Sequence, residues 1–199
     1  MGFFGPSKKE VWQQLADEIE ANYINNGFLE NDRVEAYIGN WIIVLDTYAV
    51  QTGKTYTTYT RIRAPFISYS DFYFKIYRTG LFNGIRKILG MEDIEIGHES
   101  FDEEFVIKSN SKDKVRVLFA NENIRDLIQF QPKIHLEIRD DEGFFKGHFP
   151  KNADELYFEA NDVIKDIDRL KGLFKLFELT LKELCNIGIA GSEYPEVRV

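Results

Sequence analysis

Residues 34–45 read VEAYIGNWIIVL, and this short stretch decides the fold class. Most of its residues are β-branched, aromatic or otherwise apolar, and the pair Gly39-Asn40 interrupts them in the middle. Gly and Asn tolerate the positive backbone angles that a tight turn between antiparallel strands requires. The stretch therefore predicts a β-hairpin with its turn at Gly39-Asn40.

Strand-forming sequence continues on both sides of a second turn. Residues 51–54 read QTGK and precede a run over 55–63 that is rich in Thr and Tyr, and Pro65 is expected to break that strand or to lie at its edge. A three-stranded antiparallel meander follows from these segments. Further strands are expected over 72–77, 104–108, 133–139 and 156–158, with an acidic turn over 140–143 and Phe144-Phe145 beginning the return of a second meander.

Helices are expected at both ends of the chain. Ser7-Lys8-Lys9-Glu10 fits a capping box, apolar residues continue at helical spacing to Tyr23, and Gly27 offers a left-handed stop. Two short helices are expected over 114–131, before Pro132. The longest helix is predicted over 161–186 and closes at Gly188.

These elements together predict an α+β fold. One or two antiparallel meander sheets pack against the N-terminal helix and the long C-terminal helix, in a single domain over 1–199 with a flexible tail over 190–199. Apolar residues of the last helix recur at alternating steps of three and four, which favours a buried core helix but also permits a homo-oligomer through this helix.

Composition limits the kind of protein this is. The 199 residues include 33 acids and 25 bases, so the net charge is −8, and Cys185 is the single cysteine. One cysteine forms no intramolecular disulfide, which favours a reducing compartment. The longest apolar run, over 41–45, is far shorter than the roughly 20 residues that cross a bilayer. We therefore expect a cytoplasmic protein that lacks a signal peptide and docks, if at all, at the inner face of the membrane.

Positive charge is concentrated in one part of the chain, which we call the basic window. Between Thr47 and Gly90 there are seven bases and a single acid, Asp71, so the window carries a net charge of +6. Since the whole chain carries −8, the rest of the chain carries −14. Ten Tyr and Phe residues lie among these bases. Bases interleaved with aromatic rings can hold an anion by ion pairing and stacking.

We therefore predict a non-catalytic binding or scaffolding domain that contacts an anionic membrane surface or an acidic protein. Nucleic acid is disfavoured because the whole chain is acidic. In the competing interpretation, the bases of the window pair with the acidic run over 92–104 of the same chain. The candidate interaction surface consists of Arg61, Arg63, Lys75, Arg78, Phe82, Arg86 and Lys87.

The alternative function is a hydrolase-type enzyme with a His/carboxylate site. His135 and Glu137 lie two apart on a predicted strand and share one face, so they are also weak candidates for metal ligands, with His98 or His148 as a third. No zinc-ligand spacing, nucleophile elbow or complete phosphate-binding loop is present, and Thr52-Gly53-Lys54-Thr55 lacks the upstream glycine of such a loop. We predict no catalytic residues, no bound metal and no cofactor.

A family resemblance rests on residues 97–109, which read GHESFDEEFVIKS, followed by Val117-Leu118-Phe119, Leu127-Ile128 and the strand over 134–138. This pattern resembles the bacterial domain-of-unknown-function family three-one-three-seven over roughly Arg33 to Leu184. The resemblance implies no activity and no site residues. Many members of that family resemble membrane proteins, with membrane-spanning helices before this domain. At that place this chain has the expected capped helix that begins at Ser7.

Overall fold

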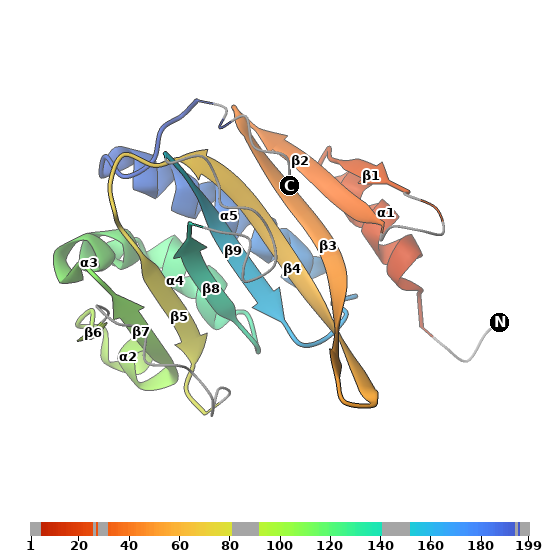
Figure 1. The fold of residues 1–199 in the computed structure, drawn as a ribbon, viewed down its shortest axis with the longest axis horizontal. Helices are drawn as coiled ribbons and strands as arrows, with labels where there is room; N and C mark the ends of the chain where they lie inside the picture. Colours follow the sequence, from red (N-terminus) through yellow and green to blue (C-terminus); the bar gives the residue numbers. More distant parts are fainter. Residues whose placement is uncertain are drawn as a thin grey trace.

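The computed structural model describes residues 5–25, 27, 32–80, 92–140, 152–193 and 195. Within these residues, nine strands form one antiparallel sheet, and helices lie behind it in the view of Figure 1. The strand order is β1-β2-β3-β4-β9-β8-β5-β7-β6. The strands are β1 (Asn22–Ile24), β2 (Arg33–Ile38), β3 (Trp41–Thr52), β4 (Thr55–Ile67), β5 (Phe74–Arg78), β6 (Glu92–Asp93), β7 (Phe105–Ser109), β8 (His135–Arg139) and β9 (Ala153–Ala160).

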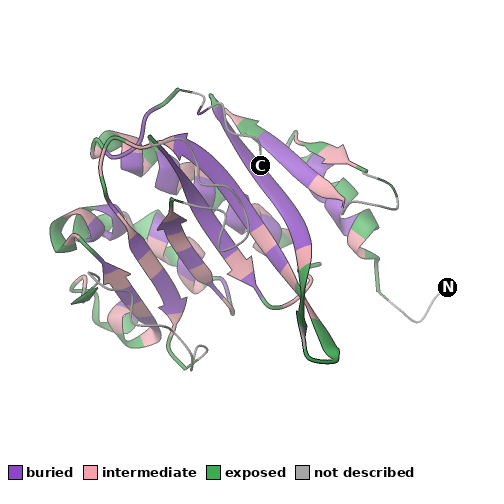
Figure 2. Ribbon diagram, viewed as in Figure 1, coloured by how far each residue is buried: buried purple, intermediate pink, exposed green. Residues whose placement is uncertain are grey.

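The helices confirm the predicted α+β class. The first, α1 (Lys8–Glu18), and the last, α5 (Ile167–Asn186), contact each other, and α4 (Glu122–Gln129) packs beside α5. Two more helices, α2 (Glu99–Glu104) and α3 (Lys112–Ala120), flank β7 and α4. Every strand that these helices cover contributes alternate residues to one hydrophobic core, which Figure 2 shows as the buried parts of the central strands.

The N-terminal helix begins as predicted but ends early. Ser7 and Glu10 form the capping box, with the Ser7 amide donating to Glu10 Oε2 at 2.8 Å. The expected stop at Gly27 is wrong, because α1 ends at Glu18 and Glu20 adopts the left-handed conformation at a φ of 55°. Tyr23, which helical spacing assigned to the apolar stripe, lies in β1 opposite Val34. Pairing with β2 therefore outweighs the helical periodicity at this point.

The three-stranded meander over 34–66 is confirmed. β2 and β3 meet at the Gly39-Asn40 turn, and β3 and β4 pair from Val44↔Arg63 out to Thr52↔Thr55. Pro65 does not break β4, which continues to Ile67. Pro65 faces Glu155 of β9 and lies beyond the last residue that pairs with β3, so it occupies an edge position on that side.

The second half of the chain joins the same sheet. β9 lies between β4 and β8, so the two expected meanders form a single sheet. The expected strands over 72–77, 104–108, 133–139 and 156–158 correspond to β5, β7, β8 and β9, and the two short helices to α3 and α4. The expected turn over 141–143 and Phe144-Phe145 lie outside the described residues.

The last helix is a core helix, as its spacing favours. Its buried residues belong to the hydrophobic core of the same chain, and Gly188 follows with a φ of 71°. The chain then returns to the sheet, since the Gly191 amide donates to Ile67 O at 2.8 Å and the Trp41 indole donates to Gly191 O at 3.2 Å. The buried helix residues are Leu170, Leu173, Phe174, Leu176, Phe177, Thr180, Leu181 and Leu184.

Candidate functional site

The face of the sheet opposite α1, α4 and α5, called the outer face below, carries a row of charged side chains beside buried apolar ones such as Ile42 and Val44 of β3. Arg61 and Arg63 alternate along β4 with Ile62 and Ala64, which point into the core. Lys75, His135 and Glu137 alternate with core residues of β5 and β8 in the same way. The structure therefore brings five of the sequence-predicted residues, Arg61, Arg63, Lys75, His135 and Glu137, onto one face.

Asp46 forms ion pairs with both arginines of this set. Arg61 donates to the two carboxylate oxygens of Asp46, from Nε at 2.5 Å and from Nη2 at 2.9 Å, and Arg63 adds a third bond at 2.9 Å. The side chains of Arg63 and Asp46 are only 5% and 11% exposed. Asp46 of β3 thus holds both guanidinium groups. Removing it would take away the carboxylate that they are hydrogen-bonded to and leave Glu155 as the acid that still interacts with their charge.

The imidazole ring of His135 lies between two carboxylates, that of Glu137 on the same strand and that of Glu159 on the neighbouring strand β9. Its Nδ1 is 3.0 Å from Glu159 Oε1 on β9, and its Nε2 is 3.4 Å from Glu137 Oε2. Lys75 on β5 completes the row, with its Nζ 2.6 Å from Glu137 Oε2. Burial lowers the pKa of His135, but its hydrogen bonds to Glu137 and Glu159 outweigh that effect and raise the pKa above the ordinary value of 6.5.

Glu159 is the centre of this arrangement. Burial raises the pKa of Glu159, but hydrogen bonds from His135, Tyr48 and Tyr157 outweigh burial and bring its pKa to about 2. The Tyr48 hydroxyl donates to Glu159 Oε2 at 2.6 Å and the Tyr157 hydroxyl donates to the same atom at 2.9 Å. Glu159 is therefore a stable anion over the whole physiological range of pH.

A further ion pair extends the row of charges along the sheet. Arg139 on β8 donates to Glu155 on β9 from Nε at 2.8 Å, and its guanidinium carbon lies 3.5 Å from the centre of the Tyr157 ring. Burial raises the pKa of Glu155 although Arg139 and Arg63 lower it. We call the whole set the polar network: Asp46, Tyr48, Arg61, Arg63, Lys75, His135, Glu137, Arg139, Glu155, Tyr157 and Glu159.

Arg78 does not belong to this face. It donates to Glu104 Oε2 at 2.5 Å and to the carbonyl oxygens of Gln129 and Gln131, and its guanidinium lies over the ring of Phe105. This pair matches the competing interpretation, in which the window pairs with the acidic run over 92–104. Arg78 fixes β5 to α2 and α4, while Phe82, Arg86 and Lys87 lie outside the described residues.

One part of the basic window projects from the sheet (Figure 1). Residues 48–59, called the arm below, form the end of the β3–β4 hairpin, and Figure 2 colours its tip as exposed. Tyr48 and Tyr59 stack at its base with ring centres 5.2 Å apart, and Gly53 makes the tip turn at a φ of 63°. Lys54 is exposed and forms no ion pair within the described part of the chain, and Tyr56 is 67% exposed.

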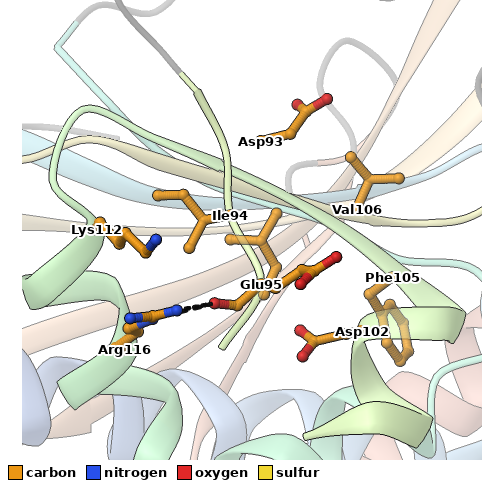
Figure 3. Close-up of a pocket in the computed structure, with 9 residues that line it drawn as sticks. Asp93, Ile94, Glu95, Asp102, Phe105, Val106, Lys112 and Arg116 are labelled. Carbon is orange, nitrogen blue, oxygen red and sulfur yellow. Dashed lines mark hydrogen bonds between the residues drawn. The ribbon is translucent and has the colours of Figure 1, made fainter. Parts of the chain in front are cut away.

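A cavity of about 350 Å³ lies between β6, β7 and the helices α2 and α3 (Figure 3). Asp93, Glu95 and Asp102 line it together with Lys112 and Arg116. Asp102 is already occupied, because it accepts the backbone amides of three residues over 96–98, and Arg116 donates to Glu95 O at 3.1 Å. Because its lining has three acidic and two basic side chains, the cavity has no excess positive charge that would favour an anion.

Within the described residues, no third ligand joins His135 and Glu137 to complete the predicted metal site. His98 is the residue before α2 and lies far along the chain from His135, and His148 is outside the described residues. Across the described ranges, no three His, Cys, Asp or Glu side chains gather closely enough to hold a metal ion.

In the same ranges, no helix is both long and apolar enough to span a membrane.

Sequence reasoning found half of the polar network and missed the acids that organise it. Asp46, Glu155 and Glu159 were not singled out, nor were Arg139 and Tyr157. The available signal was alternation, because Glu155, Tyr157 and Glu159 occupy every second position of a strand whose other positions include Leu156 and Phe158. Polar residues at every second position of a central strand indicate a second, polar face.

The chain matches no family model and no curated protein sequence. The resemblance to family three-one-three-seven therefore stays an expectation. Among solved structures, the chain is similar to "the mycobacterial trehalose monomycolate transport factor A, TtfA", with a TM-score of 0.51 and 9% sequence identity. The likeness covers 89% of this chain and 94% of that chain, and at this identity it shows a shared fold.

Proposed function

We propose that this chain is a non-catalytic binding domain whose basic window contacts an anionic membrane surface. The observation that carries the proposal is the division of charge within the window. The described bases of the body, namely Arg61, Arg63, Lys75 and Arg78, each pair with a carboxylate of the same chain. In the described part of the window, Lys54, at the tip of the acid-free arm, is an exposed base that forms no ion pair, and Asp71 is an exposed acid.

The arm has the residues that an interfacial contact requires. Tyr side chains present an aromatic ring and a hydroxyl, a combination that is favoured at the boundary between water and lipid headgroups. A lysine near an anionic surface contributes about 1 kcal/mol of attraction. Arg86 and Lys87, at the other end of the window, would add two more charges.

The geometry of the polar network favours binding over the hydrolase alternative. A general acid or base works best with a pKa near the operating pH. Here the pKa of Glu159 is about 2 and that of Glu137 is also lowered, so neither carboxylate is suited to proton transfer near neutral pH. The pKa of His135 is raised above 6.5, but its two ring nitrogens already face Glu137 and Glu159. Such charges stabilise one another and the sheet. The fold shared with a protein described as a transport factor also supports a non-enzymatic role.

Co-sedimentation of charge-reversal variants with vesicles containing phosphatidylglycerol tests the proposal. K54E and R86E/K87E are expected to lower the bound fraction several-fold, because each reversal replaces attraction by repulsion. The matched control is K9E, which makes the same charge change at an exposed lysine of α1 outside the window. Equal binding of wild type, K54E and R86E/K87E would contradict the proposal, and capture by an acidic protein but not by vesicles would replace the membrane with a protein partner.

R78E is the wrong variant for this purpose. Arg78 forms an ion pair with Glu104 and donates to two backbone carbonyls, so its reversal would destabilise the contact of β5 with α2 and α4. A loss of binding in R78E would then report loss of structure. Thermal unfolding of each variant separates the two effects, and K54E and R86E/K87E should be compared only if they unfold like wild type.

A further inference from the structure

We propose that a cavity at the β1 edge of the sheet binds a fatty acid of medium chain length, with Lys175 beside its carboxylate. The cavity has a volume of about 330 Å³ and lies between β2, the end of α1 and α5. None of the residues that line it belongs to the basic window. Binding of a fatty acid therefore goes beyond the proposed function, and it can fail or succeed independently of vesicle binding.

The cavity exists because β1 is shorter than β2. The pairing of β1 with β2 ends at Asn22↔Glu35, whereas β2 continues past β1 to Ile38 (Figure 1). Glu20, with a φ of 55°, lies in the turn that leads from α1 back into β1. Among the described strands, none pairs with residues 36–38 on this side of β2, so the space between the sheet and α5 opens at the edge.

Apolar side chains form the inner part of the cavity. Ala36 and Ile38 occupy alternate positions of β2 and point to the same side of the sheet as the core residue Val34. Phe174 on α5 is 4% exposed, and Ile19, directly after α1, is partly buried against the core. Ligand cavities are mostly apolar and have volumes of about 300–1,000 Å³. The size of this one favours a single short chain over a lipid with two long chains.

Positive charge predominates among the charged residues that line the cavity. They are Lys171 and Lys175, one turn apart on α5, and Glu178. Glu178 is shared between two lysines, because Lys175 Nζ is 2.9 Å from its Oε2 and Lys182 Nζ is 2.5 Å from its Oε1. One carboxylate thus serves two ammonium groups, and the mouth of the cavity can accept a second carboxylate.

Lys175 is better placed than Lys171 to bind that carboxylate. Lys171 forms an ion pair with Glu18 of α1 and also interacts with Asp168. The side chain of Lys175 is 53% exposed, and an exposed ion pair of this kind contributes little stability. Lys175 can therefore turn to a ligand while Lys182 continues to pair with Glu178.

These two features together select the class of ligand. A fatty acid combines one linear apolar chain with one carboxylate at its end, which matches an apolar interior below a lysine. The whole chain carries −8, so its overall field repels anions and attracts cations. A preference for an anionic amphiphile over a cationic one would therefore come from the lysines at the cavity and not from the average surface.

NMR titration of the full chain with decanoate, below the concentration at which decanoate forms micelles, tests the inference. Decanoate should shift the backbone signals of residues 19, 36–38 and 171–178 in a saturable way. Octanoate lacks two CH₂ groups of the chain and should bind roughly tenfold more weakly, because these groups are buried in the cavity. Decyltrimethylammonium has the same chain length as decanoate with the opposite charge and should bind more weakly still.

Three outcomes of this titration would overturn the inference. The first is the absence of saturable shifts at the cavity with decanoate. The second is binding of decyltrimethylammonium that is as tight as that of decanoate. The third is that an apolar peptide with a free C-terminal carboxylate shifts these signals and decanoate does not, which would replace the fatty acid with a protein partner.

Two variants separate the charge from the apolar interior. K175E should weaken decanoate binding several-fold, and K9E, the same change at an exposed lysine of α1, should bind like wild type. A36L fills part of the cavity from β2 and should weaken binding at least tenfold. Ala36 is buried, so thermal unfolding first shows whether A36L keeps its fold, and K175E tests the site in either case. Unchanged affinity of K175E, or of folded A36L, overturns the inference.

Discussion

Glu159 on β9 lies directly opposite His135 on β8, and the two side chains form an ion pair of 3.0 Å on the outer face of the sheet. Two tyrosine hydroxyls, from Tyr48 and Tyr157, donate to the other oxygen of the same carboxylate. Glu159 therefore joins three strands, because Tyr48 belongs to β3. The charged row on the outer face links neighbouring strands through ion pairs and hydrogen bonds, and its acids and bases set the dependence of stability on pH.

We expect E159Q to be less stable than wild type at neutral pH, by on the order of 3 kcal/mol. The pKa of Glu159 is lowered to about 2, so its contribution is present above the ordinary value of 4.5 and is lost as the pH falls from 4.5 towards 2. Urea unfolding at pH 7 and at pH 3 measures the difference. A difference between E159Q and wild type that stays constant over this range would contradict the assignment.

His135 gives the opposite dependence. Its pKa is raised above 6.5, so the ion pairs that it forms contribute fully below pH 6.5 and are lost as the pH rises through the pKa of the folded state. H135Q should cost more stability at pH 6 than at pH 9. Titration of the His135 ring by NMR checks the cause directly, and a pKa below 6.5 would show that burial outweighs Glu137 and Glu159.

D154N is expected to stabilise the protein at neutral pH. Burial raises the pKa of Asp154 to about 6, with Asp140 and Asp71 adding to the rise, so the ionised form is disfavoured in the folded state. The penalty is absent below pH 3.8 and complete above pH 6, and its removal should be worth roughly 3 kcal/mol at pH 7. Melting temperatures at pH 7 and pH 4 measure this, with the gain largely lost at pH 4. No gain at pH 7 would contradict the prediction.

D46A should be among the most destabilising single changes on the outer face. It leaves Arg61 and Arg63 without their carboxylate, and breaking a buried ion pair in this way costs about 3–5 kcal/mol. The matched control is D93A, which removes an exposed carboxylate from Lys108 and should cost less than about 1 kcal/mol. Chemical denaturation of both variants provides the comparison. Equal losses would mean that the Asp46 cluster contributes no more than a surface pair.

Local signals predicted the elements of the fold well. The Gly39-Asn40 turn, the Ser7 capping box and the heptad spacing of the last helix each depend on residues close together in sequence. The end of α1 could not be predicted in this way, because it depends on the pairing of residues 22–24 with 33–35. The position of β9 between β4 and β8 is likewise set by contacts between distant segments.

The candidate site was harder to predict for the same reason. Charge counting identified the bases of the window but could not show that Asp46 and Glu137 form ion pairs with three of them across the sheet. Counting also could not separate Lys54, on the projecting arm, from Arg78, which is held against Glu104. Strand register decides which charges meet, and register becomes visible only in the assembled sheet.

Contact of the basic window with an anionic membrane surface is tested most directly by co-sedimentation of the wild-type chain with vesicles. Neutral vesicles of phosphatidylcholine are compared with vesicles that also contain phosphatidylglycerol, over a series of salt concentrations. We expect binding to the anionic vesicles alone, and we expect it to weaken as salt screens the charges. Absence of binding to anionic vesicles at low salt, or binding that salt does not change, would contradict it.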